Sequence, residues 1–284
     1  MRINTNINSM RTQEYMRQNQ EKMNAAMNRL SSGKRINGGA DDAAGLAIAT
    51  RMRAKEGGLN VGARNTQDGM SALRTADSAL GSISNILLRM RDLATQAANG
   101  TNNTKDSGSL DKEYKELGGE IDHIATTTNY NGNAILNSAG INGSTKGTNV
   151  DLQLSDISKD KLTITAIDAS TDKLLGAAIG SLTGADIPTA VTNAQTEMDK
   201  IDVAIQAVAD ARATFGAQLN RLDHSLNNVN NQATNISAAA SQIEDADMAK
   251  EMSDMTKFKI LNEAGISMLS QANQNPQMVS KLLQ

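Results

Sequence analysis

The residues that could do chemistry in this sequence are few, and the clearest is a pair of adjacent aspartates, Asp41 and Asp42. Two neighbouring carboxylates can exchange protons with a substrate or bind a metal ion. Acidic residues in the first turn of a helix, however, also interact favourably with the positive end of its dipole, and a helix is expected directly behind this pair. We therefore interpret both aspartates as structural. By the same reasoning, Glu244, Asp245 and Asp247 are interpreted as a polar break between two helices.

The remaining candidates also argue against a catalytic or metal site. His123 and His224 lie in separate predicted helices without a His or Cys neighbour, so the H-E-x-x-H motif of zinc proteases is absent. The Gly33-Lys34 pair lacks the preceding glycine and the following Ser or Thr of a phosphate-binding loop. We expect a protein that is not an enzyme and that uses neither a cofactor nor a metal ion.

Bulk composition narrows the class of protein. The 284 residues carry 28 basic and 31 acidic side chains, well mixed along the chain, for a net charge of -3. A nucleic-acid-binding protein usually shows a basic stripe, so we expect no nucleic-acid partner. The chain has only 2 Phe, 3 Tyr and no Trp. Because bulky rings normally fill a thick core, we expect thin helical layers packed by Ala, Leu, Ile and Met.

No segment resembles a membrane span or a cleavable signal. The sequence lacks any run of about 18 apolar residues, and its first ten residues, MRINTNINSM, contain neither an apolar run nor a cleavage site. There are no cysteines, and disulfides would be expected in a small secreted domain. We expect a protein without membrane insertion that is either cytosolic or exported by an unusual route.

Apolar residues spaced three and four apart predict a mainly α-helical fold. Gly57-Gly58 is expected to interrupt the second helix, and Pro276 the last one. Pro188 suits the first turn of the fourth helix. The helices are predicted over residues 5–31, 41–99, 110–128, 188–243 and 247–284, with a loop at 99–109.

The fourth predicted helix has the most regular pattern in the sequence. Its positions in three-four spacing from Val191 to Ile243 are apolar except for Arg212. Two interpretations of Arg212 stay open: a buried residue that fixes the helix register, or a side chain that extends past Phe215 to water. A helix over residues 191–243 would be roughly 80 Å long, so we expect long antiparallel coiled-coil helices that form a rod.

The middle of the chain, residues 129–187, is rich in Gly, Ser, Thr and Asn and differs from the helices on either side. Asn131-Gly132 predicts a type I′ hairpin turn. Alternating apolar residues predict two short strands, marked by Leu152 and Leu154 and by Leu162, Ile164 and Ala166. We expect a small β-hairpin-containing insert.

Both ends of the chain are amphipathic, Met-rich segments, and such helices are not stable alone. They can pair with each other, but two short stripes bury little area, so their remaining apolar surface favours contact with other copies. Head-to-tail contacts that do not close give an open helical filament. We assign to this polymerisation core Ile3, Ile7, Met10, Met23, Met27, Leu30, Ile260, Leu261, Met268, Leu269, Leu282 and Leu283.

Several segments carry a family resemblance. Residues 28–49, NRLSSGKRINGGADDAAGLAIA, closely resemble the N-terminal signature of bacterial flagellin, and residues 260–283, ILNEAGISMLSQANQNPQMVSKLL, look like its C-terminal signature. Further similar segments are LLRMRDLATQAANGTN at 87–102, GEIDHIATTTNYNG at 119–132, FGAQLNRLDHSLNNV at 215–229 and IEDADMAKEM at 243–252. Several long motifs in the right order make the resemblance specific.

The resemblance implies a structural protein that polymerises into the hollow filament of the bacterial flagellum, outside the cell, after export in the unfolded state through the flagellar type III channel. In this family, paired terminal helices form an inner core domain and long helices form a rod-like shell domain. The expected division is residues 1–40 and 245–284 for the core domain, 41–128 and 188–244 for the shell domain, and 129–187 for a reduced variable insert.

The resemblance also implies partners besides further copies of the chain. These are an export chaperone at the C-terminal segment, filament cap and hook-junction proteins, and host flagellin receptors. Arg89, Leu93 and Glu113 match the positions that a vertebrate Toll-like receptor recognises in similar flagellins. Two alternative functions remain: a hook–filament junction protein, which shares the terminal helices, and a secreted coiled-coil adhesin or immune ligand.

Overall fold

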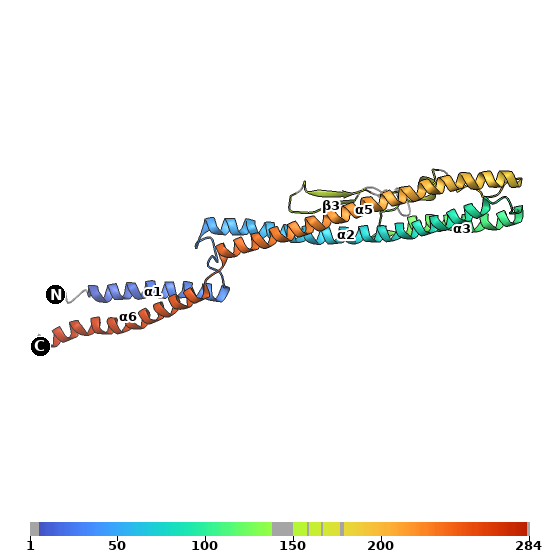
Figure 1. The fold of residues 1–284 in the computed structure, drawn as a ribbon. Helices are drawn as coiled ribbons and strands as arrows, with labels where there is room; N and C mark the ends of the chain where they lie inside the picture. Colours follow the sequence, from blue (N-terminus) through green and yellow to red (C-terminus); the bar gives the residue numbers. More distant parts are fainter. Residues whose placement is uncertain (1–5, 138–149, 158, 166, 177–178, 283–284) are drawn as a thin grey trace. The chain divides into compact units, whose positions relative to one another are not determined.

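The computed structural model describes residues 6–137, 150–157, 159–165, 167–176 and 179–282. The described part is mainly α-helical, with short antiparallel strand pairs between the helices (Figure 1). The elements are α1 (Ile7–Ser32), α2 (Ala43–Ala97), α3 (Thr104–Thr127), β1 (Asn129–Tyr130), β2 (Asn133–Ala134), β3 (Val150–Gln153), β4 (Lys161–Ile164), α4 (Thr171–Leu174), α5 (Ile187–Glu244) and α6 (Met248–Leu282).

The chain divides into two compact units. The smaller unit joins residues 1–56 to residues 234–284, and the larger unit is residues 57–233. The division falls inside α2 and α5, and the domain boundaries at residues 40 and 244 that the resemblance implies stay a prediction. Each unit is described separately below.

In the larger unit, α2, α3 and α5 run side by side (Figure 1). Ion pairs show the direction: Arg91 contacts Asp202, and Asp77 contacts Arg212, so α2 and α5 are antiparallel. Apolar residues of α2 in three-four spacing form a seam, and every one of its positions is buried. These positions are Leu73, Ala76, Leu80, Ile83, Leu87, Met90, Ala94 and Ala97. Helix α5 buries Ala194, Ile201, Val208, Phe215, Leu222 and Val229, seven residues apart.

Arg212 does not occupy the core. Ala211 is buried instead, and the Arg212 Nε atom lies 2.9 Å from the Asp77 carboxylate at the exposed edge of the α2–α5 pair. The interpretation of Arg212 as a buried residue is therefore wrong. Its side chain reaches solvent, as the other interpretation required, and it ends in an ion pair between the two helices.

Three predicted breaks differ in the structure. Helix α2 continues through Gly57-Gly58, although the boundary between the two units falls directly before Gly57. Helix α3 begins at Thr104, inside the predicted loop, because Asn103 and Asp106 form a capping box that stabilises an earlier start. Helix α6 runs past Pro276, so this proline does not end the helix.

The insert contains the expected strands. Asn131 and Gly132 have φ angles of 51° and 80°, which a type I′ turn between β1 and β2 requires. Strand β3 pairs with β4 in an antiparallel register that places Leu152 opposite Leu162. Both predicted strands are confirmed, with Leu154 just beyond β3 and Ala166 outside the described residues.

The β3–β4 hairpin packs against α2 at two glycines, Gly58 and Gly62. A Cβ atom added at Gly62 would lie 2.2 Å from the carbonyl oxygen of Leu154, and one at Gly58 would lie 2.7 Å from the Cβ atom of Asp156. Only glycine permits such a close approach of two backbones. This packing explains why Gly58, predicted as a break, lies within a continuous helix.

Buried polar contacts fix α3 against α5 and the segment that precedes it. The Tyr114 hydroxyl donates to the Glu197 carboxylate at 3.0 Å, and Glu197 also pairs with Lys200. The Asp111 carboxylate accepts the backbone N–H of Leu182 at 2.7 Å. Burial, together with the Glu197 and Asp111 carboxylates, raises the pKa of Tyr114 far above its ordinary value.

Candidate functional site

Helices α1 and α6 form an antiparallel pair in the smaller unit (Figure 1). Three contacts along the pair show one register. The Asn6 side chain donates to the carbonyl of Ala272 at 2.8 Å, Asn262 donates to Gln20 at 2.7 Å, and Arg29 lies 3.5 Å from Glu251. The predicted pairing of the terminal helices is confirmed.

The seam between these helices is thin. Ala26 is its only fully buried apolar side chain among the described residues of α1. Gly265 of α6 lies close to Met16, since a Cβ atom there would be 2.7 Å from the Met16 Cγ atom. Most other seam positions are half-buried. The pair therefore buries little apolar surface by itself, as the sequence indicated.

Much apolar surface of the pair faces solvent. Ile7, Met10, Met27, Ile260, Leu261 and Met268, all assigned to the polymerisation core, have exposed fractions between 42% and 64%. Met23, Leu30 and Leu269 are half-buried at the seam. Ile3 and Leu283 lie outside the described residues, as does the side chain of Leu282. Sequence reasoning left out further exposed apolar side chains, namely Tyr15, Met248, Met252 and Ile266.

The exposed apolar residues of α6 lie on both edges of its seam. Relative to Phe258, which is half-buried, Met252 and Ile266 lie on one side and Leu261 and Met268 on the other, by the helical turn of about 100° per residue. We call these two groups the apolar edges of α6. A helix with apolar residues on a seam and on both edges must be covered from more than one side.

Asp41 and Asp42 shape the chain between α1 and α2. The Asp41 carboxylate accepts the backbone N–H groups of Asn37 at 3.0 Å and Gly38 at 3.3 Å. The Asp42 carboxylate accepts the N–H of Gly45 at 2.9 Å in the first turn of α2. A carboxylate that caps free N–H groups at a helix start has a structural role. The structural interpretation is confirmed.

The acidic residues between α5 and α6 have different roles. Asp247 caps α6 by accepting the N–H of Ala249 at 2.9 Å, and Asp245 accepts a hydrogen bond from the Ser241 hydroxyl. The helices break here, as predicted. Glu244, however, is only 6% exposed and pairs with Arg53 and Lys34. Its partners lie far away in the sequence, and no local pattern marks them.

The residues expected to meet a host receptor lie in the larger unit. Arg89 of α2 and Glu113 of α3 are exposed and form an ion pair of 2.7 Å with each other. Leu93 is 1% exposed and packs in the core with Met90. Its side chain is covered in this structure, and a receptor contact by Leu93 stays a prediction.

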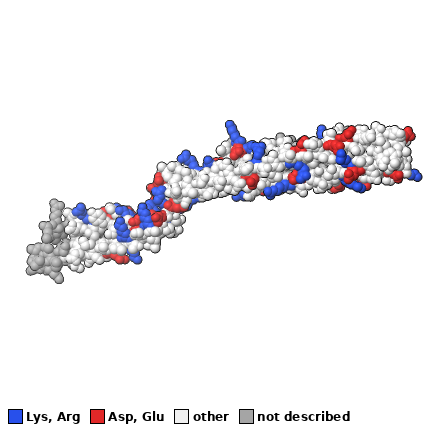
Figure 2. All heavy atoms as spheres, viewed as in Figure 1, with Lys and Arg blue, Asp and Glu red and all other residues white. Residues whose placement is uncertain are grey.

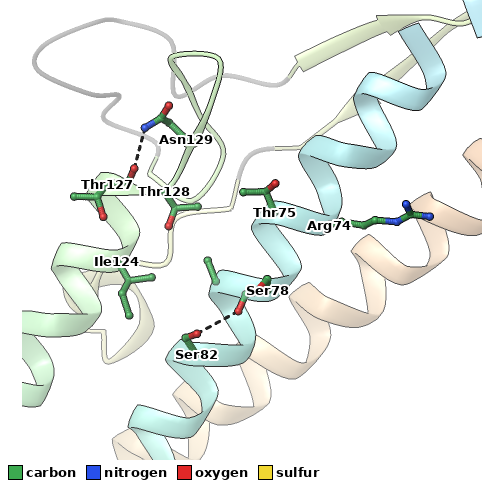
Figure 3. A pocket seen from close by; sticks show the side chains of 9 residues that line it. Arg74, Thr75, Ser78, Ser82, Ile124, Thr127, Thr128 and Asn129 are labelled. Carbon is green, nitrogen blue, oxygen red and sulfur yellow. Dashed lines mark hydrogen bonds between the residues drawn. The ribbon is translucent and has the colours of Figure 1, made fainter. Parts of the chain in front are cut away.

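The described residues contain no group of three His, Cys, Asp or Glu side chains that could hold a metal ion. A shallow groove of about 660 Å³ lies between α2 and the end of α3 (Figure 3). Its Thr75, Ser82 and Thr127 hydroxyls donate to carbonyls of their own helices. Arg74 points away from the groove (Figure 3). This groove offers no set of converging polar groups for a ligand.

The surface charges are mixed on the face shown in Figure 2, where basic and acidic side chains alternate. None of the helices in the described ranges is long and apolar enough to span a bilayer.

Comparisons with known proteins agree on one family. Residues 3–140 match the bacterial flagellin N-terminal helical region, and residues 198–283 match the flagellin C-terminal helical region. A flagellin of Listeria innocua is 45% identical over 100% of this chain and 99% of its own length. A flagellin of Halalkalibacterium halodurans is 42% identical over the whole of both chains.

Solved structures agree with this result. The crystal structure of Bacillus cereus flagellin is 57% identical, with a TM-score of 0.51, over 62% of this chain and 94% of that chain. A putative flagellar hook-associated protein from Vibrio parahaemolyticus shares the fold, with a TM-score of 0.58 over 72% of this chain and all of that chain, at 14% identity. Paired terminal helices, long antiparallel helices and a full-length match all agree, and the chain belongs to the bacterial flagellin family.

Proposed function

We propose that this flagellin polymerises through the exposed apolar surface of its α1–α6 pair. Members of the family are structural subunits of the extracellular flagellar filament and are not enzymes, and this chain is such a subunit. The comparisons do not favour a hook–filament junction protein or a secreted adhesin. The observation that supports the assembly surface is the large exposed fraction of apolar side chains on α1 and α6.

The apolar energy available on this surface is comparable with the cost of association. Complete burial of an Ile, Leu or Met side chain contributes about 1.5–3 kcal/mol. Because these side chains are already partly covered, the gain is roughly 1 kcal/mol for each one. Association of two chains loses several kcal/mol of rotational and translational freedom. Contacts on one α6 edge alone offset little of this cost, so assembly through this surface requires contacts on both edges and on α1.

The two apolar edges of α6 also bear on the symmetry of assembly. A subunit that uses two different surfaces meets two neighbours in head-to-tail contacts. When such contacts do not close into a ring, they produce an open helical polymer. This geometry is the one that a flagellar filament requires.

Substitutions on the exposed apolar surface of α6 test the proposal. The variant Ile260→Ser, Met268→Ser removes two exposed apolar side chains, while Lys259→Ser, Glu263→Ser removes two exposed charged ones as a matched control. Seeded growth of filaments is followed by light scattering and negative-stain microscopy. We expect the apolar variant to keep its helical circular dichroism and to raise the critical concentration by about tenfold or more. Growth of this variant at the wild-type critical concentration would contradict the proposed surface.

Truncation provides a second test of the same surface. Deleting residues 1–30 or 248–284 should leave a helical, soluble larger unit that does not elongate seeds. Filaments formed by either truncated chain would refute the role of the terminal helices.

We also propose that the chain is exported in the unfolded state and that an export chaperone covers the α6 segment before assembly. The exposed apolar side chains of Met248, Met252 and Ile266 support a chaperone site there. Filament cap and hook-junction proteins are proposed to meet the same terminal pair.

We also propose that a host flagellin receptor recognises Arg89 and Glu113. The pair is exposed, and a guanidinium–carboxylate pair presents directional hydrogen-bonding groups to a partner. Leu93 then acts through its packing on the buried face of α2. Arg91 is a matched control, since it lies on the same helix and pairs with Asp202 at similar exposure. Arg89→Ala should weaken receptor signalling in reporter cells by about tenfold, whereas equal signalling by Arg89→Ala and Arg91→Ala would exclude this contact.

A further inference from the structure

The chain passes twice between a terminal helix and a long helix, at residues 33–42 and at residues 245–247. We propose that Glu244 is a positioning residue that locks these two crossings together, so that α1 and α6 present one assembly surface. The proposal rests on the assembly surface proposed above. All of the groups involved lie in the smaller unit.

Backbone hydrogen bonds bring the two crossings into direct contact. Lys34 and Asp245 form an antiparallel β-bridge. The N–H of Arg35 donates to the carbonyl of Glu244 at 2.6 Å, and the N–H of Ala246 donates to the carbonyl of Gly33 at 3.0 Å. We call this arrangement the crossing clasp. An isolated bridge of two residues is too short to be stable by itself, so other contacts must support it.

The side chain of Glu244 supplies that support. Its Oε2 atom lies 3.3 Å from Arg53 Nε in α2 and 3.4 Å from Lys34 Nζ in the first crossing. The Glu244 side chain is only 7% exposed, whereas the Arg53 and Lys34 side chains are 39% and 48% exposed, so the buried carboxylate meets cations that still contact water. A buried carboxylate requires partners of opposite charge, and loss of those partners is strongly destabilising. Glu244 therefore holds the first crossing and the start of α2 against the end of α5.

Neighbouring groups keep this arrangement in place. Arg53 also pairs with Glu56 at 3.0 Å, one helical turn further along α2. The Arg35 guanidinium donates to the carbonyl of Ile243 at 2.8 Å, which satisfies one of the carbonyls at the end of α5. Glu244 is the acidic group on which the contacts of Lys34 and Arg53 converge.

The clasp determines how the terminal helices can move. With the crossings joined, the end of α1 and the start of α6 are fixed to each other at residues 33 and 246, in addition to their thin seam. The exposed apolar side chains of both helices then keep one relative position. Without the clasp, the seam alone sets that position, and the apolar edges lose their fixed geometry.

Hydrogen exchange in the full-length, unassembled chain tests the clasp directly. Glu244→Gln keeps the size of the side chain and removes its charge, and Glu263→Gln is the control on exposed α6 surface. We expect the Arg35 and Ala246 amides to exchange about tenfold faster in Glu244→Gln, with exchange of the Leu87 amide in the larger unit unchanged. Unchanged exchange at Arg35 and Ala246 overturns the proposal.

A double variant separates charge pairing from packing. If Arg53 acts through Glu244, Arg53→Gln added to Glu244→Gln increases exchange by less than twofold beyond the single variant, while additive effects overturn the pairing. Seeded growth supplies the functional readout. We expect Glu244→Gln to slow elongation by about fivefold, and faster exchange with wild-type elongation overturns the link to assembly. The variant Ile260→Ser, Met268→Ser distinguishes the two proposals, since it should lose elongation while the Arg35 and Ala246 amides keep wild-type exchange.

Discussion

Two glycines in α2 provide a sharp test of how the β3–β4 hairpin is held. A Cβ atom at Gly57 meets nothing within 4 Å, whereas one at Gly62 would lie 2.2 Å from the carbonyl oxygen of Leu154. Alanine at Gly57 should therefore stabilise the helix by about 1 kcal/mol through its better helix propensity. The two substitutions are chemically identical and lie about one and a half turns apart on the same helix.

Alanine at Gly62 gains the same propensity but must push the hairpin backbone away. Overpacking of this kind costs about 1–3 kcal/mol. The displaced hairpin also loses packing of Leu162 and Ile164, which are 5% and 1% exposed, and each such side chain contributes about 1.5–3 kcal/mol when buried. With only part of that burial lost, we expect a net destabilisation of about 2 kcal/mol.

Thermal unfolding of the unassembled chain, followed by circular dichroism, measures both effects. A change of 1 kcal/mol shifts Tm by about 2–4 °C in a unit of this size. Gly57→Ala should raise Tm by about 2–4 °C, and Gly62→Ala should lower it by about 4–8 °C. If both substitutions shift Tm in the same direction, the close approach of hairpin and helix is not what holds this region together.

Three further predictions concern single side chains. Tyr114 stays protonated in the folded chain, whereas a tyrosine in the unfolded chain ionises near pH 10. The contribution of Tyr114 to the free energy of unfolding is therefore constant below about pH 10 and falls by up to about 1.4 kcal/mol per pH unit above it. The free energy of unfolding of Tyr114→Phe, measured with urea from pH 8 to 11, should lack that alkaline loss. If the free energies of the variant and the wild type fall in parallel with pH, the raised pKa of Tyr114 is not supported. Arg212→Ala should cost less than about 1 kcal/mol, because its pair with Asp77 is solvent-exposed; a Tm decrease corresponding to several kcal/mol would contradict the exposed position. Asp42→Ala should destabilise the start of α2 by about 1 kcal/mol, seen as faster exchange of the Gly45 amide, and exchange at the wild-type rate would exclude the cap.

The long helices were predictable because their residues repeat. In α2, the seam residues from Leu73 to Ala97 lie three or four residues apart, and the structure buries all of them. The Asn131-Gly132 turn was equally predictable, since few residues adopt positive φ angles in succession. Each of these patterns is formed by residues that lie within a few positions of each other, and each depends on backbone geometry alone.

The parts that sequence reasoning missed depend on distant partners. Nothing near Gly62 indicates that Leu154 will lie against it, and nothing near Glu244 indicates Arg53 or Lys34. The start of α3 is different, because Asn103 and Asp106 have the spacing of a capping box and could have moved the predicted start. For the assembly surface, the pattern indicated apolar residues at both ends of the chain, but only the α1–α6 register separates seam residues from exposed ones.

The pairing of α1 with α6 also affects the order in which the protein can fold. The hydrogen bond between Asn6 and Ala272 joins residues 266 positions apart. Helix α1 therefore has no partner until nearly the whole chain has been synthesised, while the local contacts of α2 with α3 can form much earlier. The proposed assembly surface is consequently the last part of the subunit to be completed. Until residues near the C-terminus have folded, the chain lacks this surface.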